Sequence, residues 1–301
     1  AEEYRKMMEQ TSGTYSGIGA LVSQNAETGI ITVVKAFADA PAAKAGVKNG
    51  DIIYKVKGKE VTGVDINNVV TEMKGEKGTT VDITVYRESE KKYIDFTITR
   101  DQVNEPTVEY KMLDKKKKIG YIQISQFEEV TYDQFTKALD DLKKQGMKAV
   151  IFDVRSNPGG LYETVCKMLD EILPEGNLVS TKDKYGNEEK QTSDSKCLDM
   201  PMVVLQNKDS ASASEIFAGA IQDFNAGKIV GTQSFGKGIV QTILPLSDGS
   251  AVKLTVQDYY TPSGKNIHGK GITPDVEAEL EENATSDTQL EKAKETIMEL
   301  M

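Results

Sequence analysis

The chain has 301 residues, 38% of them hydrophobic, and a formal net charge of −10. This length allows two ordinary domains, and the hydrophobic content is enough to build a core in each. The negative charge argues against nucleic acid as a partner, because phosphate binding needs concentrated Lys and Arg, and no apolar run approaches the length of a membrane-spanning helix.

The first third of the chain has the pattern of a short helix followed by a β-rich domain. An amphipathic helix is expected within residues 1–14. A domain of residues 15–103 should follow, because its apolar positions alternate as they do in strands. The expected strands are YSGIGALVSQ, GIITVVKAF, GDIIYKVKG, TTVDITVYRE and KKYIDFTITR, with helices at APAAKAG and DINNVVTEMKG. Pro106 limits the backbone at the junction that follows.

From residue 104 onward, strands alternate with helices. The expected strands are KIGYIQI, KAVIFDV, PMVVLQ and GKIVGT, and the expected helices are residues 131–145, 161–173 and 211–225. This alternation predicts an α/β domain of residues 104–301 around a mostly parallel sheet, with a helix at its C-terminal end.

The sequence excludes two familiar kinds of hydrolytic site. A Ser-His-Asp triad needs an imidazole, and the chain has one histidine, His268, in a Gly-rich loop where a surface or packing role is expected. No G-x-S-x-G or H-E-x-x-H motif occurs, and Cys166 and Cys197 form no metal-binding pattern. We therefore expect no metal and no cofactor.

The stretch YSGIGALV places Gly17 and Gly19 around Ile18 just as a strand begins. Glycines there let successive backbone N–H groups turn inward and form a nest that can hold a carboxylate. The following strand could then pair with an extended peptide. The alternative is a glycine-rich turn without a ligand.

The stretch NKDSASASEIFAG raises a choice between a helix cap and a nucleophile. Ser212 and Glu215 fit the S-x-x-E capping box ahead of an apolar helix. The same serine would lie at the carboxyl edge of the sheet, where open α/β sheets bind ligands, and the helix N-terminus would stabilise developing negative charge. Local sequence does not separate these two roles.

With histidine excluded, a lysine could act as the general base. A desolvated Lys has a lowered pKa and can accept a hydroxyl proton near neutral pH. The strongest candidate is Lys237 in QSFGKGIVQ, where Gly236 and Gly238 permit close backbone approach. The alternative is a turn lysine between two strands.

Two family resemblances favour the binding and catalytic roles of these motifs over the purely structural alternatives. APAAKAGVKNGDIIYKVKGKEVTG, together with GIGA, resembles a PDZ domain. That resemblance implies a carboxylate-binding loop of Gly17, Ile18, Gly19 and Ala20 that recognises apolar C-terminal tails. FDVRSNPGGL, NKDSASASEIFAGAIQD, VGTQSFGKGIVQ and YYTPSGKNIHGKGITPDV follow in order and resemble the bacterial C-terminal processing peptidases, or tail-specific proteases.

The second resemblance implies a Clp-protease/crotonase-like core with a Ser–Lys dyad. Its nucleophile falls on Ser212, its general base on Lys237 and its assisting glutamine on Gln241, with Ser210 and Ser214 left as cap and packing residues. On a strand, positions 237 and 241 lie on one face, which agrees with this assignment. The implied oxyanion hole uses the backbone N–H of Ala213 and one from Gly159 or Gly160.

The expected function is therefore a serine endopeptidase that acts on proteins with apolar C-terminal tails, outside the bacterial cytoplasm. Two other functions are weighed against it: a PDZ adaptor with an inactive α/β domain, and a crotonase-like acyl-CoA enzyme, for which the PDZ domain and the Ser/Lys pair would have no use. Both ends of the chain look short beside the helical arms of the family, which leaves a homodimer open.

Overall fold

The computed structural model describes residues 2–281 and 284–301. The chain folds into two compact units, one of Gly13–Pro106 and one of Thr107–Met301 together with the N-terminal segment up to Ser12. The N-terminal helix α1 (Glu2–Ser12) thus belongs to the larger unit, although it is separated from the rest of that unit by the smaller one in the sequence. Residue 1 of the expected N-terminal segment lies outside the described residues.

The smaller unit is β-rich. Its sheet has the strand order β2-β3-β4-β6-β7, with β5 paired to β4, while β1 and β8 pair antiparallel with each other. Its elements are β1 (Thr14–Gly17), β2 (Ala20–Gln24), β3 (Ile31–Ala36), α2 (Pro41–Ala45), β4 (Ile52–Val56), β5 (Lys59–Glu60), α3 (Ile66–Met73), β6 (Thr80–Arg87), β7 (Lys92–Thr99) and β8 (Asp101–Asn104). Alternate residues of the strands and one face of α3 form its core, with Val69 and Met73 from the helix.

The expected first strand of this unit is interrupted. β1 ends at Gly17 and β2 begins at Ala20, because Gly19 has a φ of +75°, which breaks the extended backbone. The ends of both helices carry the residues that favour helix termini. α2 has Pro41 in its first turn and ends at Gly46, which has a φ of +101°. At the start of α3, the Asp65 side chain accepts a hydrogen bond from an amide of the first turn.

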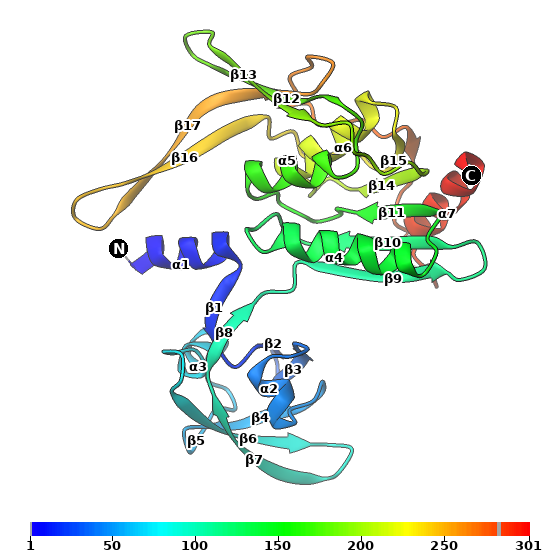
Figure 1. Ribbon diagram of the computed structural model, residues 1–301. Helices are drawn as coiled ribbons and strands as arrows, with labels where there is room; N and C mark the ends of the chain where they lie inside the picture. Colours follow the sequence, from blue (N-terminus) through cyan, green and yellow to red (C-terminus); the bar gives the residue numbers. More distant parts are fainter. Residues whose placement is uncertain (1, 282–283) are drawn as a thin grey trace. The chain divides into compact units, whose positions relative to one another are not determined.

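The larger unit is built on a mostly parallel sheet (Figure 1). Its strand order is β18-β15-β14-β11-β10-β9, in which β9 alone runs antiparallel to its neighbour. The strands are β9 (Val108–Asp114), β10 (Ile119–Ile124), β11 (Ala149–Asp153), β14 (Met202–Gln206), β15 (Gly227–Gly231) and β18 (Val276–Glu277). The order agrees with the expected alternation of strands and helices.

Helices cover both faces of this sheet. α4 (Thr131–Lys144), α5 (Tyr162–Asp170) and α6 (Ala213–Asp223) pack with Val150 and Phe152 on one face, and α7 (Thr288–Leu300) packs with Ala149 and Ile151 on the other. Because successive strand residues point to opposite faces, β11 is buried along its whole length. No helix among the described residues is long and apolar enough to cross a membrane.

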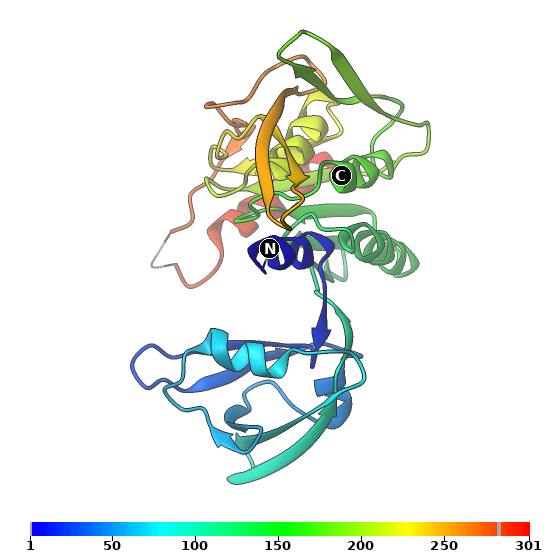
Figure 2. The ribbon, with the colours of Figure 1, turned by 90° about the vertical axis from the view of Figure 1, so that its left-hand side faces the viewer.

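A second sheet of the larger unit was not expected from the sequence. Its strand order is β13-β12-β17-β16, and β16 and β17 form a long hairpin (Figure 2). The strands are β12 (Gly176–Asp183), β13 (Glu188–Ser193), β16 (Ile239–Pro245) and β17 (Ala251–Tyr260). β13 has the sequence EEKQTS and is exposed except at its last residue, so it lacks the apolar alternation by which a strand is recognised.

Candidate active site

The candidate site lies where the parallel strands of the larger unit end. The segments that follow β10, β11, β14 and β15 carry Phe127, Gly160, Ser212 and Lys237, respectively. All four residues line one pocket of about 290 Å³. The carboxyl edge of an open α/β sheet is where such folds bind ligands. Ser212 and Gly160 also line a neighbouring pocket of about 600 Å³.

Ser212 is the residue immediately before α6 and has an unusual backbone. Its φ of 57° and ψ of −115° lie in a region that residues with a side chain rarely adopt. The carbonyl oxygen of Ser212 accepts a hydrogen bond from the Tyr259 hydroxyl at 3.0 Å, in addition to the amides of Glu215 and Ile216. Burial raises the pKa of Tyr259 well above its usual value, so this hydroxyl stays a donor.

The two other serines of the stretch anchor it to the loop after β11. The Ser210 hydroxyl donates to the Val154 carbonyl at 2.8 Å, and the Ser214 hydroxyl donates to the Asn157 carbonyl at 2.9 Å. Both serines are buried. Their hydroxyl groups are thus used in holding the segment in place, whereas Ser212 faces the pockets.

The NPGG loop packs directly against Ser212, since a Cβ on Gly159 would lie 2.7 Å from the Ser212 Cβ. Asn157 fixes this loop: its side chain donates to the Ile124 carbonyl at 2.9 Å and accepts from the Gly159 amide at 2.8 Å. Since the Gly159 N–H is engaged in this way, Gly160 is the better of the two expected donors. Within the described residues, no hydrogen bond uses the amides of Gly160 or Ala213, and both residues line the larger pocket beside Ser212.

Lys237 lies in the loop between β15 and β16. Gly236 and Gly238 on either side touch the loop that contains His268, since a Cβ on Gly238 would lie 2.6 Å from the His268 backbone nitrogen. Burial lowers the pKa of Lys237, the charge of Lys253 lowers it further, and Glu215 acts in the opposite direction. Among the described residues, no hydrogen bond joins the Lys237 amine to Ser212, although both line the same pocket.

Gln241 lines the same pocket, but the strand argument for its position does not hold. Lys237 precedes β16, and the register of β16 with β17 shifts between Val240 and Gln241, so the two residues are not four places apart on one regular strand. The Gln241 amide donates to the Thr255 hydroxyl at 3.4 Å. No hydrogen bond in the described part of the chain connects it to Lys237, and its role as assisting residue stays a prediction.

From the sequence, Glu215 was predicted only as a residue of the helix capping box, and its other contacts were not predicted. Its carboxylate is fully buried and accepts hydrogen bonds from the backbone amides of Ser212 and Lys237, each at 2.8 Å. Further donors are the Ser234 hydroxyl and the Gly236 amide, at 2.5 and 2.7 Å. The S-x-x-E motif signals the bond to Ser212, but nothing local signals the other three.

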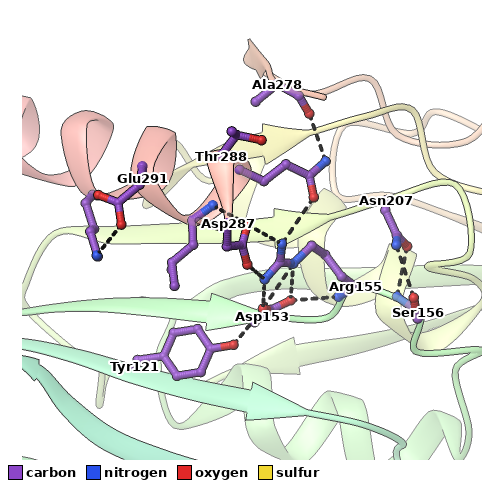
Figure 3. A network of polar contacts seen from close by, with 12 residues as sticks. Tyr121, Asp153, Arg155, Ser156, Asn207, Ala278, Asp287, Thr288 and Glu291 are labelled. Carbon is purple, nitrogen blue, oxygen red and sulfur yellow. Dashed lines mark hydrogen bonds and ion pairs between the residues drawn. The ribbon is translucent and has the colours of Figure 1, made fainter. Parts of the chain in front are cut away.

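A partly buried charged cluster around Arg155, two residues before the NPGG loop, was also missed (Figure 3). Arg155 donates to both carboxylate oxygens of Asp153 and to both of Asp287, the latter at 2.9 and 2.8 Å. Tyr121 donates to Asp153 at 2.7 Å, and Gln289 accepts from Arg155 at 3.2 Å. Asp287 is the N-cap residue of α7, so this cluster ties the C-terminal helix to the strand that leads into the NPGG loop.

The expected carboxylate-binding loop lies at the edge of the sheet of the smaller unit. The carbonyls of Ile18 and Gly19 accept hydrogen bonds from the amides of Ala42 and Phe37. Among the described residues, no hydrogen bond uses the amides of Ile18 or Gly19. Gly17 and Gly19 are both buried, and a Cβ on Gly19 would collide with Ala40. The strand that follows, β2, is an edge strand.

The remaining candidate residues take no part in this pocket. His268 is exposed in its loop, and Cys197 is exposed, whereas Cys166 is buried in α5 and burial raises the pKa of its thiol to about 12. Both cysteines are free. Within residues 2–281 and 284–301, no group of three or more His, Cys, Asp or Glu side chains is arranged to hold a metal ion.

Comparison with known proteins identifies the family. Residues 118–278 match peptidase family S41, and residues 16–98 match the PDZ domain. The chain therefore belongs to peptidase family S41. It is 41% identical over 287 residues to a carboxy-terminal-processing protease of Bartonella bacilliformis, an alignment that covers 93% of this chain and 65% of that protein. A probable CtpA-like serine protease of Staphylococcus epidermidis is 40% identical over 280 residues, which cover 92% of this chain and 56% of that protein.

Solved structures agree with this assignment. A photosystem II D1 C-terminal processing protease matches with a TM-score of 0.55 and 28% identity, over 98% of this chain and 78% of that chain. A putative S41 protease from Bacteroides fragilis matches with a TM-score of 0.61 and 17% identity, over 100% of this chain and 90% of that one, and supports the fold alone. The resemblance to the C-terminal processing peptidases and the expected fold class, an α/β core with a β-rich PDZ domain, are confirmed.

Proposed function

We propose that the chain is a serine endopeptidase in which Ser212 is the nucleophile and Lys237 the general base. The observation that carries this proposal is the shared pocket: two residues 25 positions apart in sequence (237 − 212) come from separate loops and line one cavity. A serine with a strained backbone and a lysine with a lowered pKa fit these roles.

In the proposed reaction, the neutral amine of Lys237 takes the proton of the Ser212 hydroxyl while the Ser212 oxygen attacks the scissile carbonyl. The amides of Ala213 and Gly160 stabilise the resulting oxyanion. The intermediate collapses with cleavage of the C–N bond, and the leaving amine receives the proton from Lys237. Water, deprotonated by Lys237, then releases the acyl group and restores Ser212. Lys237 thus gains and loses one proton in acylation and again in deacylation, so the reaction balances without a cofactor.

We further propose that the PDZ domain selects substrates by their C-terminal tail. The free amides at Ile18 and Gly19 can donate to a carboxylate, and the open edge of β2 can pair with the residues that precede it. The partly buried side chains of Ile66 and Val70 on α3 supply apolar surface for tail side chains. The chemistry therefore favours tails that end in apolar residues and a free carboxylate.

The test uses one peptide with an apolar C-terminus, prepared both as the free acid and as the amide. We expect the free acid to be cleaved faster, and Ser212→Ala and Lys237→Ala each to lower the rate by about 10³-fold or more. Lys208→Ala, a change of an exposed lysine close to the serine stretch, serves as the matched control and should cleave as wild type does.

Each part of the proposal can fail separately. Cleavage by Ser212→Ala at the wild-type rate would exclude this serine as nucleophile. Equal cleavage of acid and amide would argue against carboxylate capture. Binding of the free acid without cleavage by the wild-type chain would favour a tail-binding adaptor in place of a protease.

We also place the protein outside the bacterial cytoplasm, in the cell envelope or secreted, on the basis of the family resemblance. Cell fractionation with an antibody against the chain tests this location. Recovery of the full-length protein in the cytoplasmic fraction would contradict it.

A further inference from the structure

Glu215 stands out among the buried charged groups of the larger unit because its hydrogen bonds join two segments of the candidate site. It is fully buried in the first turn of α6. One carboxylate oxygen accepts from the amides of Ser212 and Lys237, and the other accepts from the Ser234 hydroxyl and the Gly236 amide. Two of these donors belong to the backbone of the two residues of the proposed dyad.

The four contacts satisfy both oxygens of the Glu215 side chain. Three donors are backbone amides, and the Ser234 hydroxyl itself accepts from the Ile272 amide at 2.6 Å, so its proton points to Glu215. Each carboxylate oxygen therefore accepts two hydrogen bonds. A buried carboxylate with this many charge-assisted hydrogen bonds is held rigidly, because loss of any one bond leaves a buried polar group unsatisfied.

From this arrangement we infer that Glu215 is a positioning residue that holds Ser212 and Lys237 at a fixed separation. The inference rests on the proposed function and deepens it. Neither of the two backbones is held by regular secondary structure at these points: Ser212 precedes α6 with a φ of 57°, and Lys237 lies in a loop before β16. One side chain with two oxygens supplies the link that secondary structure does not.

This role exceeds that of an ordinary capping box. In a capping box, the glutamate returns only to the amide of its own N-cap residue. Here the bonds to Gly236 and Lys237 reach 21 and 22 residues along the chain. Displacement of reacting groups by about 1 Å is enough to cost about 100-fold in rate, so loss of the link should be visible in turnover even where binding is intact.

The test compares Glu215→Gln and Glu215→Asp with Glu295→Gln, which removes the same charge from an exposed position of α7. Gln keeps one acceptor oxygen, but its NH₂ group would face two of the four groups that donate to Glu215. In Glu215→Gln, we expect amide hydrogen exchange at Ser212, Gly236 or Lys237 to speed up at least about tenfold, while the rest of α6 stays protected. Glu295→Gln should exchange as wild type does.

The kinetic readout separates positioning from general loss of structure. We expect kcat of Glu215→Gln to fall about 100-fold with KM changed less than about threefold, because the link acts on the reacting groups rather than on tail binding. The acidic limb of its pH–rate profile should move to lower pH, since Glu215 opposes the lowering of the Lys237 pKa. Glu215→Asp, which keeps the charge, should leave that limb closer to wild type.

Two results would overturn the inference. One is unchanged amide exchange at all three positions in Glu215→Gln, whatever the cleavage assay gives. The other is a folded Glu215→Gln protein with wild-type kcat. If Glu215→Gln does not fold, Ser234→Ala removes one of the four donors and should give the same pattern in weaker form, and an unchanged kcat and exchange there count against the link. A wild-type chain that cleaves no tail peptide would refute the proposed function, while the exchange measurement would still decide whether Glu215 joins the two segments.

Discussion

Gly159 lies directly against Ser212: a Cβ placed on Gly159 would come within 2.7 Å of the Ser212 Cβ and of the Ala211 carbonyl oxygen. The φ of Gly159 is +106°, a conformation that residues with a side chain rarely adopt. The loop after β11 and the segment after β14 can therefore meet at Ser212 because the residue at position 159 is a glycine. This contact brings the amide of Gly160 to the same pocket as the Ser212 side chain.

Gly159→Ala should abolish most of the activity. The new methyl group needs space that Ser212 and Ala211 occupy, so the NPGG loop must move away and take the Gly160 amide with it. Loss of one oxyanion-hole donor typically costs about 10²–10³ in kcat. Steady-state cleavage of a tail peptide measures the effect.

The matched control is Gly186→Ala, in the turn between β12 and β13. Gly186 has a φ of +86°, but a Cβ there would meet nothing within 4 Å. Both variants share the backbone penalty of about 1 kcal/mol. Gly159→Ala should lose further stability because its methyl group collides with Ser212 and Ala211, and only Gly159→Ala should lose activity. Equal kcat in the two variants would argue against the close approach.

The pH dependence of cleavage should follow Lys237. A general base acts in its neutral form, so the rate should rise with pH and level off above the pKa of Lys237, which burial and Lys253 lower. The charged side chains that line the pocket or act on Lys237 are Lys253, Glu128 and Glu215. Lys253→Gln removes the like charge, and we expect the acidic limb of the profile to move to higher pH.

The profile of log(kcat) against pH for wild type and Lys253→Gln tests this expectation. Lys228→Gln, which changes a lysine outside the pocket, should leave the profile where it is. A limb that moves to lower pH in Lys253→Gln would have the wrong sign for a lysine base and would contradict the assignment.

The sequence could predict the parts of the site that short segments determine. Glycines beside Lys237, the NPGG loop and the S-x-x-E pattern at Ser212 are all local, and the structure brings these segments together at one pocket. Alternation of buried strands with helices likewise predicted the parallel sheet, because burial on both faces leaves continuous apolar runs.

The parts that were missed depend on contacts between distant positions. Arg155 pairs with Asp287, which is 132 residues further along the chain, and Glu215 binds amides 21 and 22 residues away. The periodic patterns of helices and strands carry no information over such sequence separations. The prediction that Lys237 and Gln241 lie on one face of a regular strand was wrong. The alternation of side chains in a sequence does not reveal a register shift such as the one in β16.

Asp287→Asn should destabilise the protein without affecting the cap of α7. Asn caps helices about as well as Asp, so the amide of Leu290 keeps an acceptor, but Arg155 loses one of its two anions (Figure 3). Because the Arg155 side chain is only 15% exposed, we expect a loss of about 2 kcal/mol in the free energy of unfolding, measured with chemical denaturant.

The difference between wild type and Asp287→Asn should depend on pH. Burial alone would raise the pKa of Asp287, but hydrogen bonds from Arg155 outweigh it and the pKa is lowered. The stabilisation is therefore complete above the unfolded-state value of about 3.9 and is lost as the pH falls through the folded-state value. Glu291→Gln breaks only an exposed ion pair with Lys294 and should change stability by less than about 0.5 kcal/mol. Equal stability of Asp287→Asn and wild type at neutral pH would exclude a contribution from the ion pair.

Tyr259→Phe should lower turnover with little change in packing. Tyr259 is 1% exposed, and its hydroxyl is a side-chain donor to the Ser212 carbonyl. Removing the hydroxyl leaves the ring in place and the carbonyl still bonded to two amides of α6, so the loss of stability should be only about 1 kcal/mol. Ser212, however, has a strained backbone, and strain of about 1–3 kcal/mol persists only where surrounding contacts enforce it.

With one of those contacts gone, we expect Ser212 to leave its reactive conformation part of the time and kcat to fall about tenfold at unchanged KM. Thermal unfolding and steady-state kinetics on the same samples separate this effect from loss of the fold. Tyr185→Phe removes a hydroxyl from a tyrosine that is 78% exposed in the β12–β13 turn and should behave as wild type in both measurements. A Tyr259→Phe variant with wild-type kcat would mean that the α6 amides and Glu215 hold Ser212 in place without help from Tyr259.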